Sequence, residues 1–174
     1  MRTAMSELAA WTLAFCRWCN GSFFGHGIRE SAWLFPFVEI FHLLALALLG
    51  GILILVNLSL LGVRFGNTST PELARELRPW MLGSIAVMLV SGFLLFSTEA
   101  VKMYGNWAFQ LKMIFLLLAL LFTLTLHRRV IESQRTPASL RRVAAVVSLL
   151  LWLGVGLGGR ALGYVTTAAS AVTG

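Results

Sequence analysis

The strongest pattern along the chain is a series of four long apolar blocks separated by polar connections. The blocks run from about Trp33 to Val63, from Trp80 to Phe96, from Trp107 to Leu126 and from Val143 to Tyr164. A helix of about 20 apolar residues crosses the roughly 30 Å hydrocarbon core of a bilayer. The pattern therefore predicts an all-α integral membrane protein, a four-helix bundle that forms one domain over residues 1–174.

A shorter apolar stretch, Ala9–Cys19, lies in the N-terminal segment 1–31 and is too short to cross a membrane. Trp11, Phe15 and Trp18 recur there at helical spacing, which is typical of a helix lying in the membrane interface. A cleaved signal peptide is the alternative interpretation, although little positive charge precedes the stretch. We expect an interfacial helix.

The first polar connection contains signals for a helix of its own. Thr70 can cap such a helix, and Pro71 suits its first turn. Pro79 is expected to end it, because proline lacks the N–H that a helix interior needs. The sequence thus predicts a short helix separate from the second apolar block.

The composition agrees with a membrane protein and argues against a soluble one. Of the 174 residues, 58% are hydrophobic and 12% are charged, and the mean hydropathy is +0.83. A soluble domain carries about 25% charged residues to cover its surface. The formal net charge of +7 does not indicate nucleic-acid binding, because most basic residues flank the apolar blocks.

Basic residues are concentrated in the first and third polar connections. We call the end of the predicted bundle that carries these two connections the Arg-rich end. The second connection contains Lys102 alone, and Lys112 lies just inside the third block. The positive-inside rule places the Arg-rich end in the cytoplasm, so both chain termini are expected outside. The Arg-rich connections hold Arg64, Arg75 and Arg78, and then Arg128, Arg129, Arg135, Arg141 and Arg142.

Four ionisable residues lie within the apolar blocks, where burial costs several kcal/mol unless the group is paired or ligating. At about 1.5 Å per residue, His42 lies roughly 10 Å below the predicted outer end of its block, and Glu39 lies one turn higher. Lys112 and Arg160 lie roughly 7 Å and 6 Å below the same surface. We expect these groups from three helices to converge, and Glu99 can join them.

His127 is the other histidine near a span, at the Arg-rich end of the third block. It lies roughly 20 Å from the level of His42, so the two imidazoles cannot be the axial ligands of one haem. His127 is either an interfacial residue beside Arg128 or part of a second, inner site.

Glycines near His42 and Arg160 have two interpretations. Small residues allow close approach of a neighbouring helix, and this explains most of them. Alternatively, a planar ligand lies between the first and fourth blocks, with Arg160 or Lys112 at its acidic edge. The glycines are Gly50 and Gly51 in the first block and Gly154, Gly156, Gly158 and Gly159 in the fourth.

The residues around this candidate site resemble those of an uncharacterised family of small bacterial four-span membrane proteins. The resemblance is carried by Trp33–His42 (WLFPFVEIFH), Asn106–Lys112, Ser148–Trp152 and Gly159–Arg160. It covers most of residues 31–165 and implies a location in the bacterial inner (plasma) membrane.

More distantly, the layout is similar to that of the copper-resistance CopD proteins and the HemJ-type protoporphyrinogen oxidases. Those proteins place a His in the first span, a Trp and a Lys early in the third, and often a His near its end. The matching positions are His42, Trp107, Lys112 and His127. Because HemJ-type proteins are linked to b-type haem, the resemblance implies haem b at His42. The first polar connection departs from the HemJ pattern, so porphyrinogen oxidation is not carried over.

The N-terminal segment contains a C-x-x-C motif, Cys16 and Cys19, on the side expected to be outside the cell. The motif can be a small disulfide, a redox pair or, together with His26, a weak soft-metal site. Two cysteines on an interfacial helix can also act simply as small hydrophobic residues.

The leading hypothesis is a b-type haem protein in membrane electron transfer, with quinone as a candidate partner and the haem near the outer membrane face. His42 would be an axial ligand, and Glu39 would tune it. Lys112 and Arg160 would neutralise the haem propionates. The second axial ligand would be Met113, which lies at the same depth, or His42 of a second protomer.

Two other functions fit the same sequence. A non-catalytic accessory or anchor subunit of a larger membrane complex would use the four ionisable residues as an ion-pair network. Copper handling or small-solute transport would use them as an entry site, although four helices leave little room for alternating access. The serines lack a neighbouring base, so no hydrolytic site is expected, and the sequence leaves the enzymatic activity and the oligomeric state open.

Overall fold

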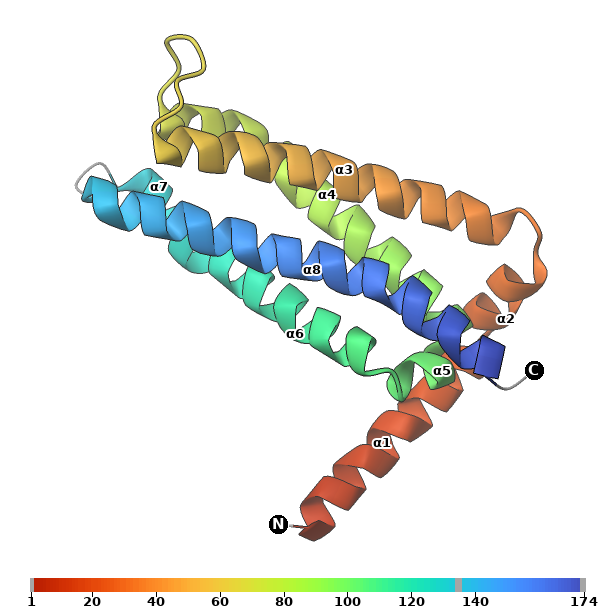
Figure 1. The fold of residues 1–174 in the computed structure, drawn as a ribbon. Coiled ribbons are helices and arrows are strands. Elements are labelled where there is room, and N and C mark those ends of the chain that lie inside the picture. Colours follow the sequence, from red (N-terminus) through yellow and green to blue (C-terminus); the bar gives the residue numbers. More distant parts are fainter. Residues whose placement is uncertain (1, 134–135, 173–174) are drawn as a thin grey trace. The chain divides into compact units, whose positions relative to one another are not determined.

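The computed structural model describes residues 2–133 and 136–172, and the regular elements found there are all helical (Figure 1). This confirms the predicted all-α class. In chain order the elements are α1 (Arg2–Gly21), α2 (Phe23–Glu30), α3 (Leu34–Leu61), α4 (Thr70–Thr98), α5 (Ala100–Tyr104), α6 (Trp107–Phe122), the π-helix η1 (Thr123–His127), α7 (Arg128–Glu132) and α8 (Ala138–Val172).

Among the described residues, four helical stretches are long and apolar enough to cross a membrane. They are Leu34–Leu61, Thr70–Thr98, Trp107–Ile131 and Ala138–Ala161. Each contains most of one predicted apolar block, so the chain is a multi-pass membrane protein. Most of their large side chains are exposed, as expected where lipid rather than water surrounds the helices.

The predicted break before the second span is wrong. Instead of a short helix that ends at Pro79, α4 continues from Thr70 to Thr98 with Pro79 inside it. Proline removes one helix hydrogen bond, but the turns on both sides keep theirs, and membrane helices tolerate such a loss. The first polar connection is correspondingly shorter, and the predicted cap residue Thr70 is the first residue of the long helix.

Two local features were not predicted from the periodicity. The third span does not remain α-helical to its end, because Thr123–His127 forms a π-helix. A further short helix, α5, occupies the connection after α4. A single-turn π-helix widens the helix by one residue and is frequent at functional sites, and apolar periodicity carries no signal for either feature.

The chain divides into two compact units, and α3 and α4 each contribute a segment to both. The first unit combines Met1–Leu46 with Ser84–Asn106, and the second combines Ala47–Gly83 with Trp107–Gly174. The first unit therefore holds α1, α2, α5 and the predicted outer segments of α3 and α4. The second holds α6, η1, α7 and α8, together with the segments of α3 and α4 that lead to the Arg-rich end.

The corner between α1 and α2 organises the first unit, and α1 also packs against α5. The Ser22 hydroxyl donates to the Cys19 carbonyl at 2.7 Å and accepts from the Gly25 N–H at 3.2 Å. A Cβ at Gly25 would lie 2.6 Å from the carbonyl oxygens of Cys19 and Ser97. The corner therefore requires glycine, because any side chain would collide with backbone of α1 and α4.

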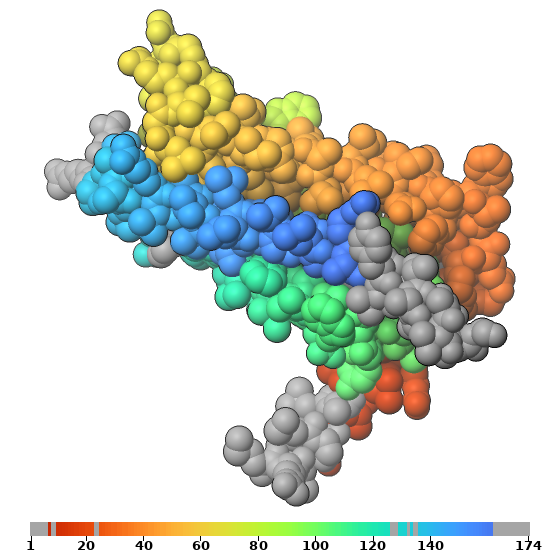
Figure 2. Space-filling view, viewed as in Figure 1, coloured from red at the N-terminus to blue at the C-terminus, as the bar shows by residue number. Residues whose placement is uncertain are grey.

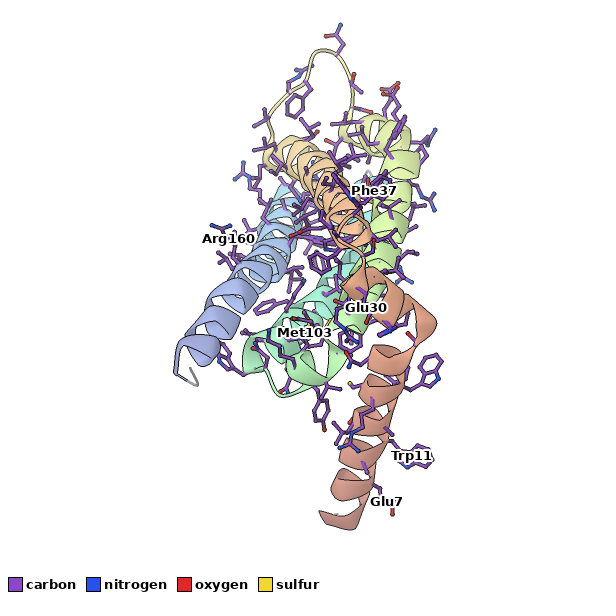
Figure 3. All side chains as sticks on the ribbon, turned by 90° about the vertical axis from the view of Figure 1, so that its right-hand side faces the viewer. Glu7, Trp11, Glu30, Phe37, Met103 and Arg160 are labelled. Atoms are coloured by element: carbon purple, nitrogen blue, oxygen red, sulfur yellow. The ribbon has the colours of Figure 1, made fainter. Side chains whose placement is uncertain are left out.

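The helix α1 presents an aromatic face to the exterior. Trp11, Phe15 and Trp18 are 75%, 50% and 66% exposed, and Trp11 projects from the helix in Figure 3. On the other side, Thr12 donates to the Tyr104 hydroxyl of α5 at 3.3 Å. The predicted helix is thus present, and its position in the membrane interface stays a prediction.

The second unit is built around a close contact between α6 and α8. A Cβ at Gly154 of α8 would lie 2.6 Å from the Phe115 ring of α6, so the absent side chain makes room for that ring. The hydroxyl groups of Ser59 on α3 and Thr70 on α4 are 2.7 Å apart and tie these helices together. Small residues at helix contacts are the usual way to achieve such packing in membranes.

The turn between α3 and α4 stands out from the helix ends in Figure 2 (yellow). Gly62 and Gly66 have φ values of +104° and +62°. Residues with a side chain rarely adopt this left-handed conformation, so glycine is favoured at both positions. The turn lies at the Arg-rich end, where it carries Arg64.

Candidate functional site

The centre of the candidate site is a hydrogen bond between α3 and α4 in the first unit. The Nδ1 atom of His42 lies 2.9 Å from the Oγ of Ser91. His42 is half-buried and Ser91 is buried. A polar pair inside apolar helices is expensive to leave unsatisfied, so this hydrogen bond positions the imidazole against α4.

The other hydrogen bonds of Ser91 favour one tautomer of the His42 imidazole. The Ser91 hydroxyl donates to the Val87 carbonyl at 2.6 Å and also faces the Met88 carbonyl at 3.4 Å. A hydroxyl has one hydrogen, so when Ser91 donates to Val87 its Oγ accepts from His42 Nδ1. This arrangement corresponds to the neutral tautomer with the hydrogen on Nδ1 and the lone pair that a metal ligand needs on Nε2.

Gly92 leaves the space that the His42 ring occupies. A Cβ at Gly92 would lie 3.2 Å from Cε1 and 3.6 Å from Nδ1 of the ring. The ring would have to move by a few tenths of an ångström to admit even a methyl group. The adjacent pair Ser91 and Gly92 thus supplies both the hydrogen-bond acceptor and the room for the imidazole.

Glu39, one turn before His42, has a different environment. It is exposed, and it makes no hydrogen bond or ion pair with the residues that the structure describes. The partner of the imidazole is therefore Ser91, so the prediction that the serines lack a neighbouring base is wrong for Ser91. The only sequence signal for it is a small pair, Ser91-Gly92, in the span that follows His42.

Lys112 and Arg160 belong to the second unit, where α6 crosses α8. A Cβ at Gly158 would lie 3.0 Å from the Cβ of Lys112, and one at Gly159 would lie 3.8 Å from its Nζ. The lysine stem therefore runs over the two glycines toward the position of Arg160. Arg160 itself is exposed, and its side chain lies at the surface of α8 in Figure 3.

The room predicted at the glycines is thus filled in part by a lysine side chain and by a Phe ring. Gly50 differs, because it is half-buried and nothing lies within 4 Å of a Cβ built there. It shares the α3 face that also carries Asn57. The flat ligand between the first and fourth spans stays a prediction.

The four predicted residues fall into two pairs, one in each unit. Glu39 and His42 lie in the first unit, and Lys112 and Arg160 lie in the second. Met113 is 45% exposed on α6, also in the second unit. Their convergence at one level of the membrane stays a prediction.

A second polar arrangement crosslinks the helices of the second unit. The Asn57 amide on α3 donates to the Leu53 carbonyl at 2.8 Å and to the Ser148 hydroxyl on α8 at 3.2 Å. One turn along α8, the Trp152 indole donates to the Thr123 hydroxyl of η1 at 3.0 Å. Asn57, Ser148 and Thr123 are buried. We call these four side chains the polar belt, and they connect three helices.

The cysteines of the C-x-x-C motif lie on the buried side of α1. Cys16 and Cys19 are free thiols that pack with Ala100, and Phe96 and Tyr104 cover them. Burial raises the pKa of both thiols, and for Cys19 the neighbouring Cys16 adds to the rise. Both groups are therefore poorly ionised and weakly nucleophilic at neutral pH.

His26, the third member of the predicted soft-metal site, is exposed on α2. Its Nε2 lies 3.2 Å from the Glu30 carboxylate, and its Nδ1 lies 3.4 Å from the Arg29 guanidinium. Among the residues that the structure describes, no three His, Cys, Asp or Glu side chains gather as metal ligands. The metal site and the redox pair stay predictions.

His127 is the last residue of η1, at the Arg-rich end as expected. Its side chain lies outside the described part of the structure, so the choice between an interfacial residue and an inner site stays open. Glu99 is exposed and forms an ion pair with Lys102 at 3.4 Å in the connection after α4. It is thus already partnered within the first unit.

Among known proteins, the chain matches one family whose function is unknown, and the match covers most of the chain. No curated protein and no solved structure matches the chain. A family model matches residues 15–165, which include every candidate site residue from Cys16 to Arg160. The match agrees with the resemblance to an uncharacterised family and carries no information on CopD or HemJ-type proteins. The chain belongs to the family of unknown function DUF6644.

Proposed function

We infer that this protein is a b-type haem protein that acts in electron transfer in the bacterial inner membrane. The observation that supports this most is the orientation of His42 by Ser91 at 2.9 Å. Histidines that ligate a metal usually donate their other ring N–H to a fixed acceptor, which sets the tautomer and the ring plane. His42 has this arrangement before any ligand is considered.

The residues of the chain fit the rest of the cofactor's requirements by their chemistry. Lys112 and Arg160 are cations inside or beside apolar helices of the second unit. Anionic groups stabilise cations in a low-dielectric setting, and haem propionates would add such groups. Glu39 would modulate the charge near His42.

A bound haem b would supply one-electron redox chemistry near the outer membrane face, with quinone as the proposed exchange partner. The chain's own contribution is to hold the imidazole in one tautomer and one orientation. The exposed apolar helices keep the site within lipid, which lowers the local dielectric and thereby tunes the redox potential.

A second protein ligand to a bound haem would come from one of two side chains. Met113 is exposed on α6, so its thioether is accessible for ligation. The alternative is His42 of a second copy of the chain, which would make the protein a homo-oligomer around a shared haem. The ratio of haem to protein separates them, because the first arrangement gives one haem per chain and the second gives one per two chains.

The test is a reduced-minus-oxidised visible spectrum of the detergent-purified protein, produced with ample haem supply, together with a pyridine haemochrome assay. We expect b-type bands at about one haem per chain or per dimer. A colourless protein would overturn the proposal. Copurification of stoichiometric partner subunits with such a colourless chain would instead support the accessory-subunit function.

A further inference from the structure

Two adjoining cavities lie at the Arg-rich end of the second unit, and the proposed electron-transfer function does not use them. One has a volume of about 390 Å³, and the other has a volume of about 450 Å³. Pro71, Arg75 and Ile131 line both. Each volume lies in the range typical of small-molecule sites, about 300–1,000 Å³, and the shared wall makes them two parts of one site.

The smaller cavity is lined mainly by apolar side chains. Its wall includes Ile52, Leu53 and Val56 of α3, all of them buried. Leu82 of α4 and Leu124 of η1 also line it, and they are 42% and 44% exposed. Because part of the lining is itself exposed on spanning helices, an acyl chain can enter this cavity from the side of the bilayer.

The π-helix contributes to the apolar cavity directly. Thr123 and Leu124, the first two residues of η1, line it, and the Thr123 hydroxyl is held by Trp152. The wide turn of a π-helix changes the direction of the side chains that follow it. The irregularity in the third span therefore lies at a cavity, as π-helices often do.

The larger cavity is polar and cationic. Arg75 of α4 and Arg141 of α8 line it, together with hydroxyl groups such as those of Ser69 and Ser133. Glu72 is the one acidic residue of its described lining, and its carboxylate lies 3.5 Å from the Ser69 N–H at the start of α4. The balance of charge therefore favours an anion.

The arginines of the site have no acidic partner among the described residues. Arg75 lines both cavities, Arg78 lines the apolar one and Arg141 lines the polar one. The ion pairs found in the described part of the chain involve other residues. Within that part, these three guanidinium groups also make no hydrogen bonds. Guanidinium groups bind phosphate bidentately, which makes such a set suitable for a phosphate group.

We propose that the two cavities form one binding site for an acidic phospholipid of the surrounding bilayer. Its head-group phosphate contacts Arg75 and Arg141 in the polar cavity, and one acyl chain occupies the apolar cavity. The polar cavity is as large as the apolar one, which suits a phospholipid head group better than a bare carboxylate. Basic pockets between spanning helices on the cytoplasmic side are known to bind anionic head groups.

The test titrates the detergent-purified full chain with phosphatidylglycerol, with phosphatidylcholine and with oleate, and counts bound molecules by native mass spectrometry. We expect one tightly bound phosphatidylglycerol and binding of phosphatidylcholine at least about tenfold weaker. Equal affinity for the two phospholipids would overturn the proposal. Displacement of phosphatidylglycerol by oleate at equal concentration would also overturn it, because the ligand would then be a single-chain carboxylate.

A matched pair of double variants separates a defined site from general surface charge. Arg75→Ala with Arg141→Ala removes two lining residues, and Arg64→Ala with Arg142→Ala removes the same charge from the same end without touching either lining. We expect at least a tenfold loss of phosphatidylglycerol affinity in the first variant and less than a twofold loss in the second. Equal losses in both would contradict a defined site.

The apolar half of the site has its own test, which leaves the charge unchanged. Ala74 lines the apolar cavity, and Ala74→Phe would occupy the space of the acyl chain. We expect this variant to bind phosphatidylglycerol at least about fivefold more weakly, while Ala86→Phe, at an exposed position of the same helix, binds normally. Unchanged binding in Ala74→Phe would show that no chain enters the cavity.

Discussion

Two polar residues of α3, Asn57 and His42, each form a hydrogen bond with a serine of another helix, but the two hydrogen bonds have different consequences. In the polar belt, Asn57 donates both amide hydrogens, one to Leu53 and one to Ser148. In the other pair, the contacts of Ser91 favour donation from His42 Nδ1, and in that tautomer Nε2 carries a lone pair rather than a hydrogen. In the polar belt, both amide hydrogens of Asn57 are used in hydrogen bonds within the protein. In the histidine pair, the hydrogen bond orients an imidazole that is suited to bind a metal.

The two pairs also differ in how deeply their side chains are buried. Asn57 and Ser148 are both 0% exposed, while His42 is only half-buried. A fully buried polar side chain must complete its hydrogen bonds within the protein. A partly exposed imidazole of defined tautomer is suited to a ligand. Variants of the belt should therefore change stability alone, and variants around His42 should change cofactor binding.

The largest effect is expected from Ser91→Ala. Without its acceptor, the imidazole loses its fixed plane and tautomer, and loss of such an outer partner typically weakens metal binding by about 10–100-fold. Haem titration of the purified variant measures this loss. The control is Ser97→Ala on the same helix, because Ser97 donates to the Phe93 carbonyl in the same way but has no hydrogen bond with a histidine in the described part of the chain. Equal haem affinity in the two variants would contradict the role of Ser91.

Asn57→Leu should lower the free energy of unfolding by about 1–2 kcal/mol and leave haem content unchanged. The variant removes the donor from the buried Ser148 hydroxyl, which then lacks this partner. Adding Ser148→Ala should restore part of the loss, because both partners are then apolar. Thermal unfolding in detergent measures the stability, and a loss of haem in Asn57→Leu would break the distinction between the pairs.

Gly92→Ala should have a smaller effect on the cofactor than Ser91→Ala. The new Cβ would lie 3.2 Å from the His42 ring, and turning the ring away from its rotamer costs about 0.5–1.5 kcal/mol. This corresponds to a roughly two- to tenfold loss of haem affinity. Gly83→Ala is the matched control, because nothing lies within 4 Å of a Cβ at that position of the same helix.

Trp152→Phe should give the smallest change. It removes the indole N–H that Thr123 accepts at 3.0 Å, and hydrogen bonds between membrane helices contribute about 0.6 kcal/mol on average. Thermal unfolding of this variant is compared with that of Trp107→Phe, an exposed tryptophan at the start of α6. A shift in the haem spectrum of Trp152→Phe would mean that the belt also serves the cofactor.

The sequence predicted the features that depend on local apolar length. Four blocks long enough to span a membrane became four spanning helices, because the requirement for about 20 apolar residues is strict. The predicted ends of the helices were less accurate. The helix α8 begins at Ala138 rather than at Val143, because Arg141 and Arg142 can be part of a helix as well as flank one. Pro79 was predicted to end a helix, but it lies inside α4, because a proline removes only one hydrogen bond of the helix.

Features that depend on helix pairing were not predictable from periodicity. Ser91 is 49 residues from His42, and only the packing of α3 against α4 brings the two together. The glycines of α8 indicated room for a neighbouring group, but the sequence did not identify the groups that fill it at Gly154 and Gly158, which are the Phe115 ring and the Lys112 stem of α6. The two cavities at the Arg-rich end are lined by residues of α3, α4, η1, α7 and α8, so no single segment carries a pattern that predicts them.

The most direct test of the central proposal, that His42 ligates haem b, compares the reduced-minus-oxidised spectra of His42→Ala and His26→Ala. Both variants remove one imidazole, but His26 is exposed on α2 and paired with Glu30. We predict that His42→Ala loses the b-type bands while it stays folded by circular dichroism, and that His26→Ala keeps them. An unchanged haem spectrum in folded His42→Ala would contradict the assignment.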